Sequence, residues 1–119
     1  MSSAKDLTIR EAQEKVEKFL NLRGKDWTQT DNRFYMFTHM SEEMGELARH
    51  IITAELSLNL DRTSREAMPR ERVVSLIKDD LGDILYHVLK FAVACNIDIA
   101  EAFEEAMSDI EQRYGRKTT

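Results

Sequence analysis

The chain has 119 residues, enough for one ordinary domain and too few for two. Its 17 Lys and Arg against 22 Asp and Glu give a net charge of −5. This charge argues against a general nucleic-acid binder, which needs a basic surface to displace counterions from phosphates. With 42% hydrophobic residues, four Gly and one Pro, the chain is expected to form long elements around a packed core, which excludes a disordered acidic tail and a turn-rich β-sandwich.

The spacing of apolar side chains predicts a helix in each half of the first sixty residues. The first helix begins at Thr8, where Glu11 can complete a capping box, and it ends at Gly24. Residues 23–32 are expected to form a loop that carries the only tryptophan. The second helix is predicted over about residues 33–58, with a stripe of large apolar side chains along one side.

Two further helices are predicted in the second half. Residues 59–68 are polar and are expected to form a mobile connection. Pro69 suits the first turn of a third helix that ends near Asn96, and Asp98 resembles the N-cap of a fourth helix that Gly115 ends. No segment alternates with period two for long enough to predict a strand. The expected fold is therefore all-α, a four-helix, bundle-like single domain over residues 1–119.

One pattern occurs twice, in the middle of each long predicted helix. Residues 43–50 and residues 80–87 both read acid, apolar, Gly, acid, apolar, and each octet ends in His. Helix positions three apart lie about 60° apart, so the two acids of each octet share a helix face. If the apolar stripes of the two helices pack together, the carboxylates of both octets approach one another.

Four such carboxylates repel one another unless a cation compensates their charge. Hard oxygen ligands favour Mg²⁺ or Mn²⁺ over zinc. The predicted metal ligands are Glu43, Glu46, Asp80 and Asp83. A single pair of acids at this spacing is usually a solvated helix face, and it is the matched repetition that favours metal binding.

The glycines and histidines of the pattern give further expectations. A mid-helix Gly costs about 1 kcal/mol relative to Ala, so Gly45 and Gly82 suggest a close approach of helices or of a ligand. His39, His50 and His87 each lie one turn from an acid. They are expected to bind phosphate oxygens, to orient carboxylates or to contact a base, with His87 the first choice and His50 the last.

The run from Glu42 to Glu46, followed by Asp80-Leu81-Gly82-Asp83, resembles the EExxE…ExxD signature of the all-α nucleotide pyrophosphohydrolases of the MazG type. The resemblance extends over residues 16–114 and includes the segment NIDIAEAFEEA at the start of the last helix. It implies a Mg²⁺-dependent enzyme that hydrolyses nucleoside triphosphates to monophosphate and pyrophosphate, with Mn²⁺ a possible substitute. It also implies a homodimer or homotetramer.

The resemblance also assigns roles. The four repeated acids become the metal ligands, and Glu42 becomes an auxiliary acid that binds a further metal or helps to activate water. Trp27 matches an aromatic that packs against the base in some relatives; a hydrophobic plug over the end of the bundle is the alternative. Asp80 stands where Glu is usual, and a Lys and an Asn of the last helix of many relatives are missing. Phosphate contacts are therefore expected from residues such as Lys78 and Arg113.

Three alternatives stay open. The segment from Asp83 to His87 looks like part of the phosphoribosyl-ATP pyrophosphohydrolases of histidine biosynthesis, which share the helical architecture. A non-catalytic helical interaction module would show similar stripes and charge. A di-iron carboxylate bundle would need Glu-x-x-His, whereas here His follows the second acid of each octet by four positions.

The location and assembly of the chain follow from composition. Cys95 is the only cysteine, so a reducing compartment suits the chain, and its apolar neighbours suggest a buried thiol. No secretory signal and no membrane-spanning stretch is recognised, so the expected location is the cytoplasm. The amount of apolar helix surface favours an oligomer.

Overall fold

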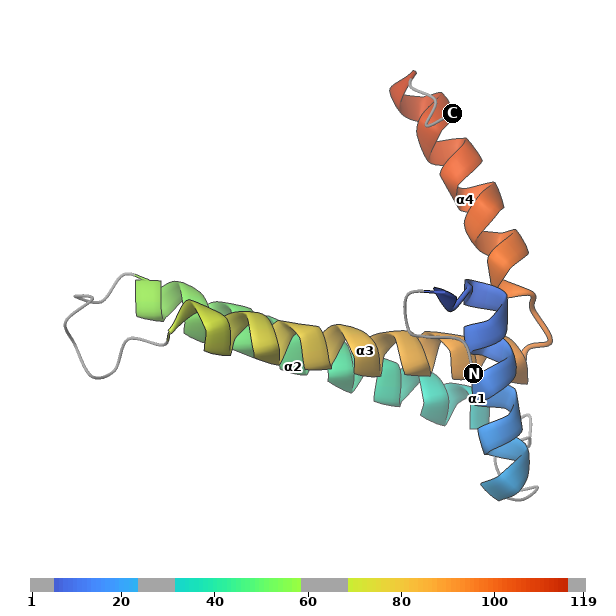
Figure 1. Cartoon of the computed structure of the whole chain (residues 1–119), viewed down its shortest axis with the longest axis horizontal. Helices are drawn as coiled ribbons and strands as arrows, with labels where there is room; N and C mark the ends of the chain where they lie inside the picture. Colours follow the sequence, from blue (N-terminus) through green and yellow to red (C-terminus); the bar gives the residue numbers. More distant parts are fainter. Residues whose placement is uncertain (1–5, 24–31, 59–68, 116–119) are drawn as a thin grey trace. The chain divides into compact units, whose positions relative to one another are not determined.

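The computed structural model describes residues 6–23, 32–58 and 69–115, with the backbone alone at residues 32 and 55–58. The described residues form four α-helices: α1 (Ile9–Arg23), α2 (Asn32–Leu58), α3 (Arg70–Ala94) and α4 (Ile99–Tyr114) (Figure 1). No strand occurs within these ranges, so the predicted all-α class is confirmed. Residues 24–31 and 59–68, most of the predicted loop and the whole predicted connection, lie outside the described residues.

The predicted start signals of the helices are largely confirmed. The backbone N–H of Glu11 donates to Thr8 Oγ1 (3.1 Å) and the N–H of Thr8 donates to Glu11 Oε1 (3.2 Å), which is a capping box. Pro69 lies one residue before α3, where its carbonyl accepts from the N–H of Val73. It therefore precedes the helix, one position earlier than predicted.

One residue determines each end of α4: Asp98 caps its start, and Gly115, which has no side chain, ends it. Asp98 Oδ1 accepts from the N–H groups of Ala100 (3.0 Å) and Glu101 (3.4 Å) at the N-cap. Gly115 ends the helix with a φ of 65°, in the left-handed region that lacks a steric penalty only for glycine.

The chain divides by its internal contacts into two units, and α3 contributes to both. One unit comprises residues 1–33 and 89–119, and the other comprises residues 34–88. In the first unit α1 contacts α4, and in the second α2 and α3 run side by side in opposite directions (Figure 1). The expected single domain over residues 1–119 stays a prediction.

One glutamine ties α1 to the start of α4. The Gln13 side chain donates to the carbonyl of Ile97 (2.7 Å) and accepts from the N–H of Ile99 (2.9 Å). Arg10 adds an ion pair with Asp98 at 2.9 Å. These bonds fix the turn between α3 and α4 against α1.

We expect Asp98→Ala to lower the free energy of unfolding by about 1–2 kcal/mol, because α4 loses its N-cap. The ion pair with Arg10 is exposed and adds little. Asp98→Asn keeps the capping oxygen and should lie within about 0.5 kcal/mol of the parent protein. Urea unfolding followed by circular dichroism measures both values, and equal losses in the two variants would contradict the capping role.

The core of the described residues is small. Leu20, Leu89 and Ala92 are buried in one unit, and Met36 and Ala54 in the other. Much of the predicted apolar stripes is exposed instead, including Phe19, Phe37, Met44, Ile51, Leu81, Phe103 and Tyr114. The periodicity identified an apolar side of each helix, but the described part of the chain covers only a fraction of it.

Two smaller expectations concern Cys95 and the membrane. Cys95 is only half-buried, so the prediction of a buried thiol was wrong; it lies in the turn that follows α3. Among the described helices, none combines the length and the apolar character that crossing a bilayer requires.

Candidate functional site

The most buried charged side chain of the described residues belongs to the acidic repeat. Asp80 of α3 is 4% exposed and is the one buried polar residue among them. His50 of α2 lies against it, with Nδ1 at 2.5 Å from Asp80 Oδ2. A buried carboxylate is costly without a partner, and His50 supplies that partner from the opposite helix.

The first acid of the other octet has a looser partner. Glu43 of α2 faces His87 of α3, with Oε1 at 3.8 Å from Nε2. Its second oxygen, Oε2, is buried and has no hydrogen-bond partner among the described residues. An unpaired buried carboxylate oxygen is unfavourable, and a bound cation or hydrogen-bond donor would relieve the cost.

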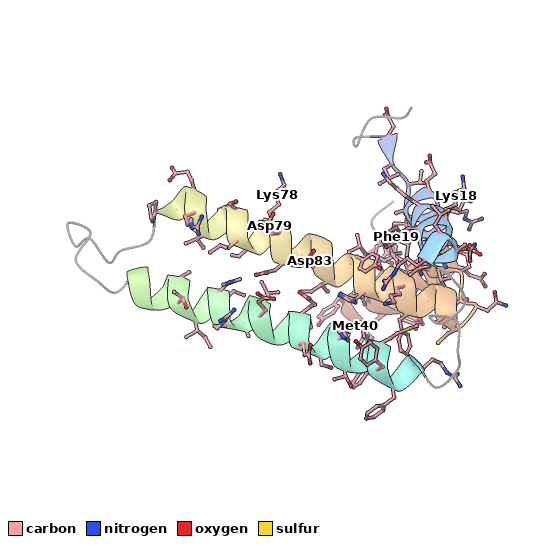
Figure 2. The ribbon with its side chains drawn as sticks, turned by 90° about the horizontal axis from the view of Figure 1, so that it is seen from below. Lys18, Phe19, Met40, Lys78, Asp79 and Asp83 are labelled. Carbon is pink, nitrogen blue, oxygen red and sulfur yellow. The ribbon has the colours of Figure 1, made fainter. Side chains whose placement is uncertain are left out.

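The two contacts reveal how the repeat is arranged. In each octet the first residue is the acid and the eighth is the histidine, and the first acid of one octet meets the histidine of the other. This crossed pairing places the octets in antiparallel register, as the directions of α2 and α3 require (Figure 2). The two octets face each other through acid–histidine pairs, and the predicted approach of their carboxylates stays a prediction.

The second acid of each octet lies further out. Glu46 is exposed and pairs with Arg49 one turn on, at 3.5 Å. Asp83 is exposed and lies along the edge of α3 that borders α2 (Figure 2). Within the described residues, no three His, Cys, Asp or Glu side chains come close enough to hold a metal ion. The four-carboxylate ligand set thus stays a prediction.

The glycines do not bring the helices together. A Cβ added at Gly45 or Gly82 would meet no described atom within 4 Å. The expected close approach of helices at these residues was wrong among the described residues, because both glycines lie at exposed positions of their helices. The alternative expectation, the approach of a ligand, is compatible with this open space.

The chain belongs to a known family. A family model described as the MazG nucleotide pyrophosphohydrolase domain matches residues 34–116.

The chain is a member of the MazG family.

The match begins just after the start of α2 and extends past α4, so it includes both acidic octets. No curated protein and no solved structure matches the chain.

Aromatic and histidine side chains form a row of contacts next to Glu43 on the side of α2 that leads to its start. The rings of His39 and His87 stack with centroids 5.9 Å apart, and Tyr35 packs on His39 at 4.4 Å. Tyr86 meets the edge of His87 at 5.1 Å. Two of the three histidines contact an acid, His50 at Asp80 and His87 at Glu43, whereas the contacts of His39 are with the rings of Tyr35 and His87. The sequence reasoning missed Tyr35, although its spacing of four from His39 and eight from Glu43 marked one helix face.

The other predicted MazG residues are more scattered. Glu42 is exposed on α2, next to Glu43. Lys78 is exposed on the flank of α3 that points away from α2 (Figure 2), so in the chain itself it does not join the acids. Arg113 is in the last turn of α4, outside the unit that holds the acids. Trp27 lies outside the described residues.

The donor chemistry of this site fits the divalent metal that the MazG family implies. The repeated acids supply carboxylate oxygens, which Mg²⁺ prefers. One of these oxygens, Glu43 Oε2, is buried and unpartnered, as a ligand awaiting a cation would be. Glu43 and Asp80 lie between the helices, whereas Glu46 and Asp83 are open to solvent at the rim.

Proposed function

We propose that this MazG domain is a Mg²⁺-dependent nucleoside triphosphate pyrophosphohydrolase that releases pyrophosphate and a nucleoside monophosphate from NTPs or dNTPs. The observation that carries the proposal is the buried, unpartnered oxygen of Glu43 within the crossed acidic repeat of α2 and α3. Membership in the MazG family supports the reaction class.

The negative charge of both the chain and the substrate is the reason that the proposal includes a metal ion. The chain carries a net charge of −5, and the proposed site contains several carboxylates. Like charges repel, so a polyanionic substrate needs a cation between itself and these acids. Mg²⁺, when bound, would supply this neutralisation and stabilise charge on the pyrophosphate leaving group.

The residues have distinct proposed roles. Glu43 and Asp80, which lie between α2 and α3, would hold the ion together with the exposed Glu46 and Asp83. Glu42, exposed beside them, accepts the proton of the attacking water. His39 and His87 donate to phosphate or contact the base, as do Trp27, Lys78 and Arg113 where a nucleotide or a second subunit brings them near.

A homodimer or homotetramer is part of the proposal. The unit of residues 34–88 leaves large apolar side chains exposed, among them Phe34, Phe37, Ile52, Val74, Leu81 and Leu85. A second copy would cover this surface and could complete a ligand set that the described chain does not assemble. We also propose action in the cytoplasm, whose reducing conditions suit the lone Cys95.

A nucleotide panel tests the reaction. With Mg²⁺ we expect stoichiometric pyrophosphate and monophosphate from at least one NTP or dNTP, and no orthophosphate. Pyrophosphate and orthophosphate are scored separately by enzyme-coupled assays run with and without inorganic pyrophosphatase. Orthophosphate as the sole product, or no product from any nucleotide, would contradict the proposal.

Phosphoribosyl-ATP belongs in the same panel. The segment from Asp83 to His87 resembles the corresponding part of phosphoribosyl-ATP pyrophosphohydrolases, and its His87 lies against Glu43. Turnover of phosphoribosyl-ATP well above that of every NTP and dNTP would favour this second substrate. Such a result would keep the reaction class and change the substrate.

A further inference from the structure

His50 carries an interaction that the proposed mechanism does not use. Its Nδ1 lies 2.5 Å from Asp80 Oδ2, the shorter of the two acid–histidine contacts between α2 and α3. The Asp80 side chain is 6% exposed and that of His50 is 22% exposed. When the carboxylate is ionised it can only accept, and the hydrogen bond then runs from His50 Nδ1–H to Asp80 Oδ2.

This bond has a geometric consequence for the carboxylate. The imidazole contacts Oδ2 of Asp80, so Oδ1 is the oxygen that His50 leaves for another ligand. Burial strengthens the effect, because a hydrogen bond shielded from water competes less with solvent. Glu43 shows the related arrangement, with Oε1 toward His87 and Oε2 unpartnered.

The acid–histidine contact occurs twice between α2 and α3, which distinguishes it from an ordinary contact between helices. Both octets place a histidine one turn beyond the second acid, and in both cases that histidine reaches the first acid of the opposite helix. A contact serving only to join α2 and α3 would be satisfied by apolar side chains, which are less costly to bury than an ion pair. The two crossed pairs therefore have a second effect besides joining the helices: each histidine orients the carboxylate that it contacts.

We infer that His50 is a positioning residue that holds the Asp80 carboxylate in the orientation needed to bind the divalent cation. The inference rests on the proposed function, which makes Asp80 a metal ligand. Groups that hydrogen-bond to metal ligands set the direction of the ligand's lone pairs, and their loss typically weakens metal binding about 10–100-fold.

Three substitutions in the full chain test this role. His50→Ala removes the hydrogen bond, whereas His50→Asn places an amide N–H near the position of Nδ1 and should restore it. Thr53→Ala is the control, because Thr53 is exposed one turn further along α2 and its hydroxyl donates to the carbonyl of Arg49. Mn²⁺ binding without nucleotide is followed by electron paramagnetic resonance of the free ion.

We expect His50→Ala to weaken Mn²⁺ binding about 10-fold, with His50→Asn and Thr53→Ala within about 3-fold of the parent protein. In turnover assays the Mg²⁺ concentration for half-maximal activity should rise in His50→Ala, while kcat at saturating Mg²⁺ changes less. Unfolding of the metal-free proteins in EDTA measures the stability that each substitution costs.

Unchanged Mn²⁺ binding in His50→Ala would overturn the inference, as would an equal loss in His50→Asn. A loss of stability in EDTA without a loss of Mn²⁺ affinity would assign His50 a purely structural role and overturn it as well. If the parent protein binds no Mn²⁺, the inference fails together with the metal site. If Mn²⁺ binding follows the expected order and no nucleotide is hydrolysed, the proposed reaction fails and the positioning role stands.

Discussion

Glu43→Gln is expected to lower turnover of nucleoside triphosphates by at least about 100-fold while the helices stay folded. The amide has the shape of the carboxylate and keeps one oxygen, but it loses the charge that a divalent cation requires. Asp83→Asn, which removes a predicted ligand on α3, should lower turnover by a similar factor. Asp83 is exposed, so its substitution leaves the packing of the described residues undisturbed.

Asp79 provides the matched control for this pair. It is exposed on α3, directly beside Asp80, and Asp79→Asn removes the same unit of charge without touching a predicted ligand. Its turnover should stay within about 2-fold of the parent value, because surface substitutions of this kind have small effects. Full activity in both Glu43→Gln and Asp83→Asn would contradict the assigned site.

The stability of the metal-free protein distinguishes a damaged site from a damaged fold. Glu43 Oε2 is buried without a partner, so the carboxylate destabilises the metal-free chain. Unfolding in EDTA should therefore show Glu43→Gln to be at least as stable as the parent protein. Lower stability together with lost activity would attribute the loss to unfolding.

Local signals in the sequence were sufficient to predict the helix ends. Thr8 with Glu11, Asp98 and Gly115 act on backbone groups within a few residues, so their effect does not depend on the rest of the fold. The apolar periodicity likewise predicted four helices. It could not predict burial, since Phe37 or Phe103 lies on an apolar stripe whether or not the same chain covers it.

The sequence did not predict the register between α2 and α3. The repeat predicted that Glu43 and Asp80 belong to one site, but their partners depend on the register of two antiparallel helices. The crossed contacts place His50, the histidine expected to matter least, against the most buried acid. Mid-helix position and spacing were equal for His50 and His87, and only the tertiary contact distinguishes them.

Removal of divalent metal is expected to abolish turnover, and excess Mg²⁺ added after EDTA should restore it, with Mn²⁺ a substitute. The reason is electrostatic, since a chain of net charge −5 with two acids lying between α2 and α3 repels a triphosphate. Initial rates in metal-depleted buffer, followed by titration with each ion, measure the effect. Turnover that survives EDTA would contradict metal dependence.

Thermal unfolding without nucleotide tests whether the ion binds at the acids or arrives only with the substrate. A cation bound at 100 times its dissociation constant stabilises the folded state by about 2.7 kcal/mol. Mg²⁺ should therefore raise the unfolding midpoint of the parent protein and of Asp79→Asn, and raise it much less in Glu43→Gln. Equal rises in all three would place the bound ion elsewhere, because charge at Glu43 would then be irrelevant to binding. A rise confined to the proteins that retain Glu43 would link the buried Oε2 to the cation.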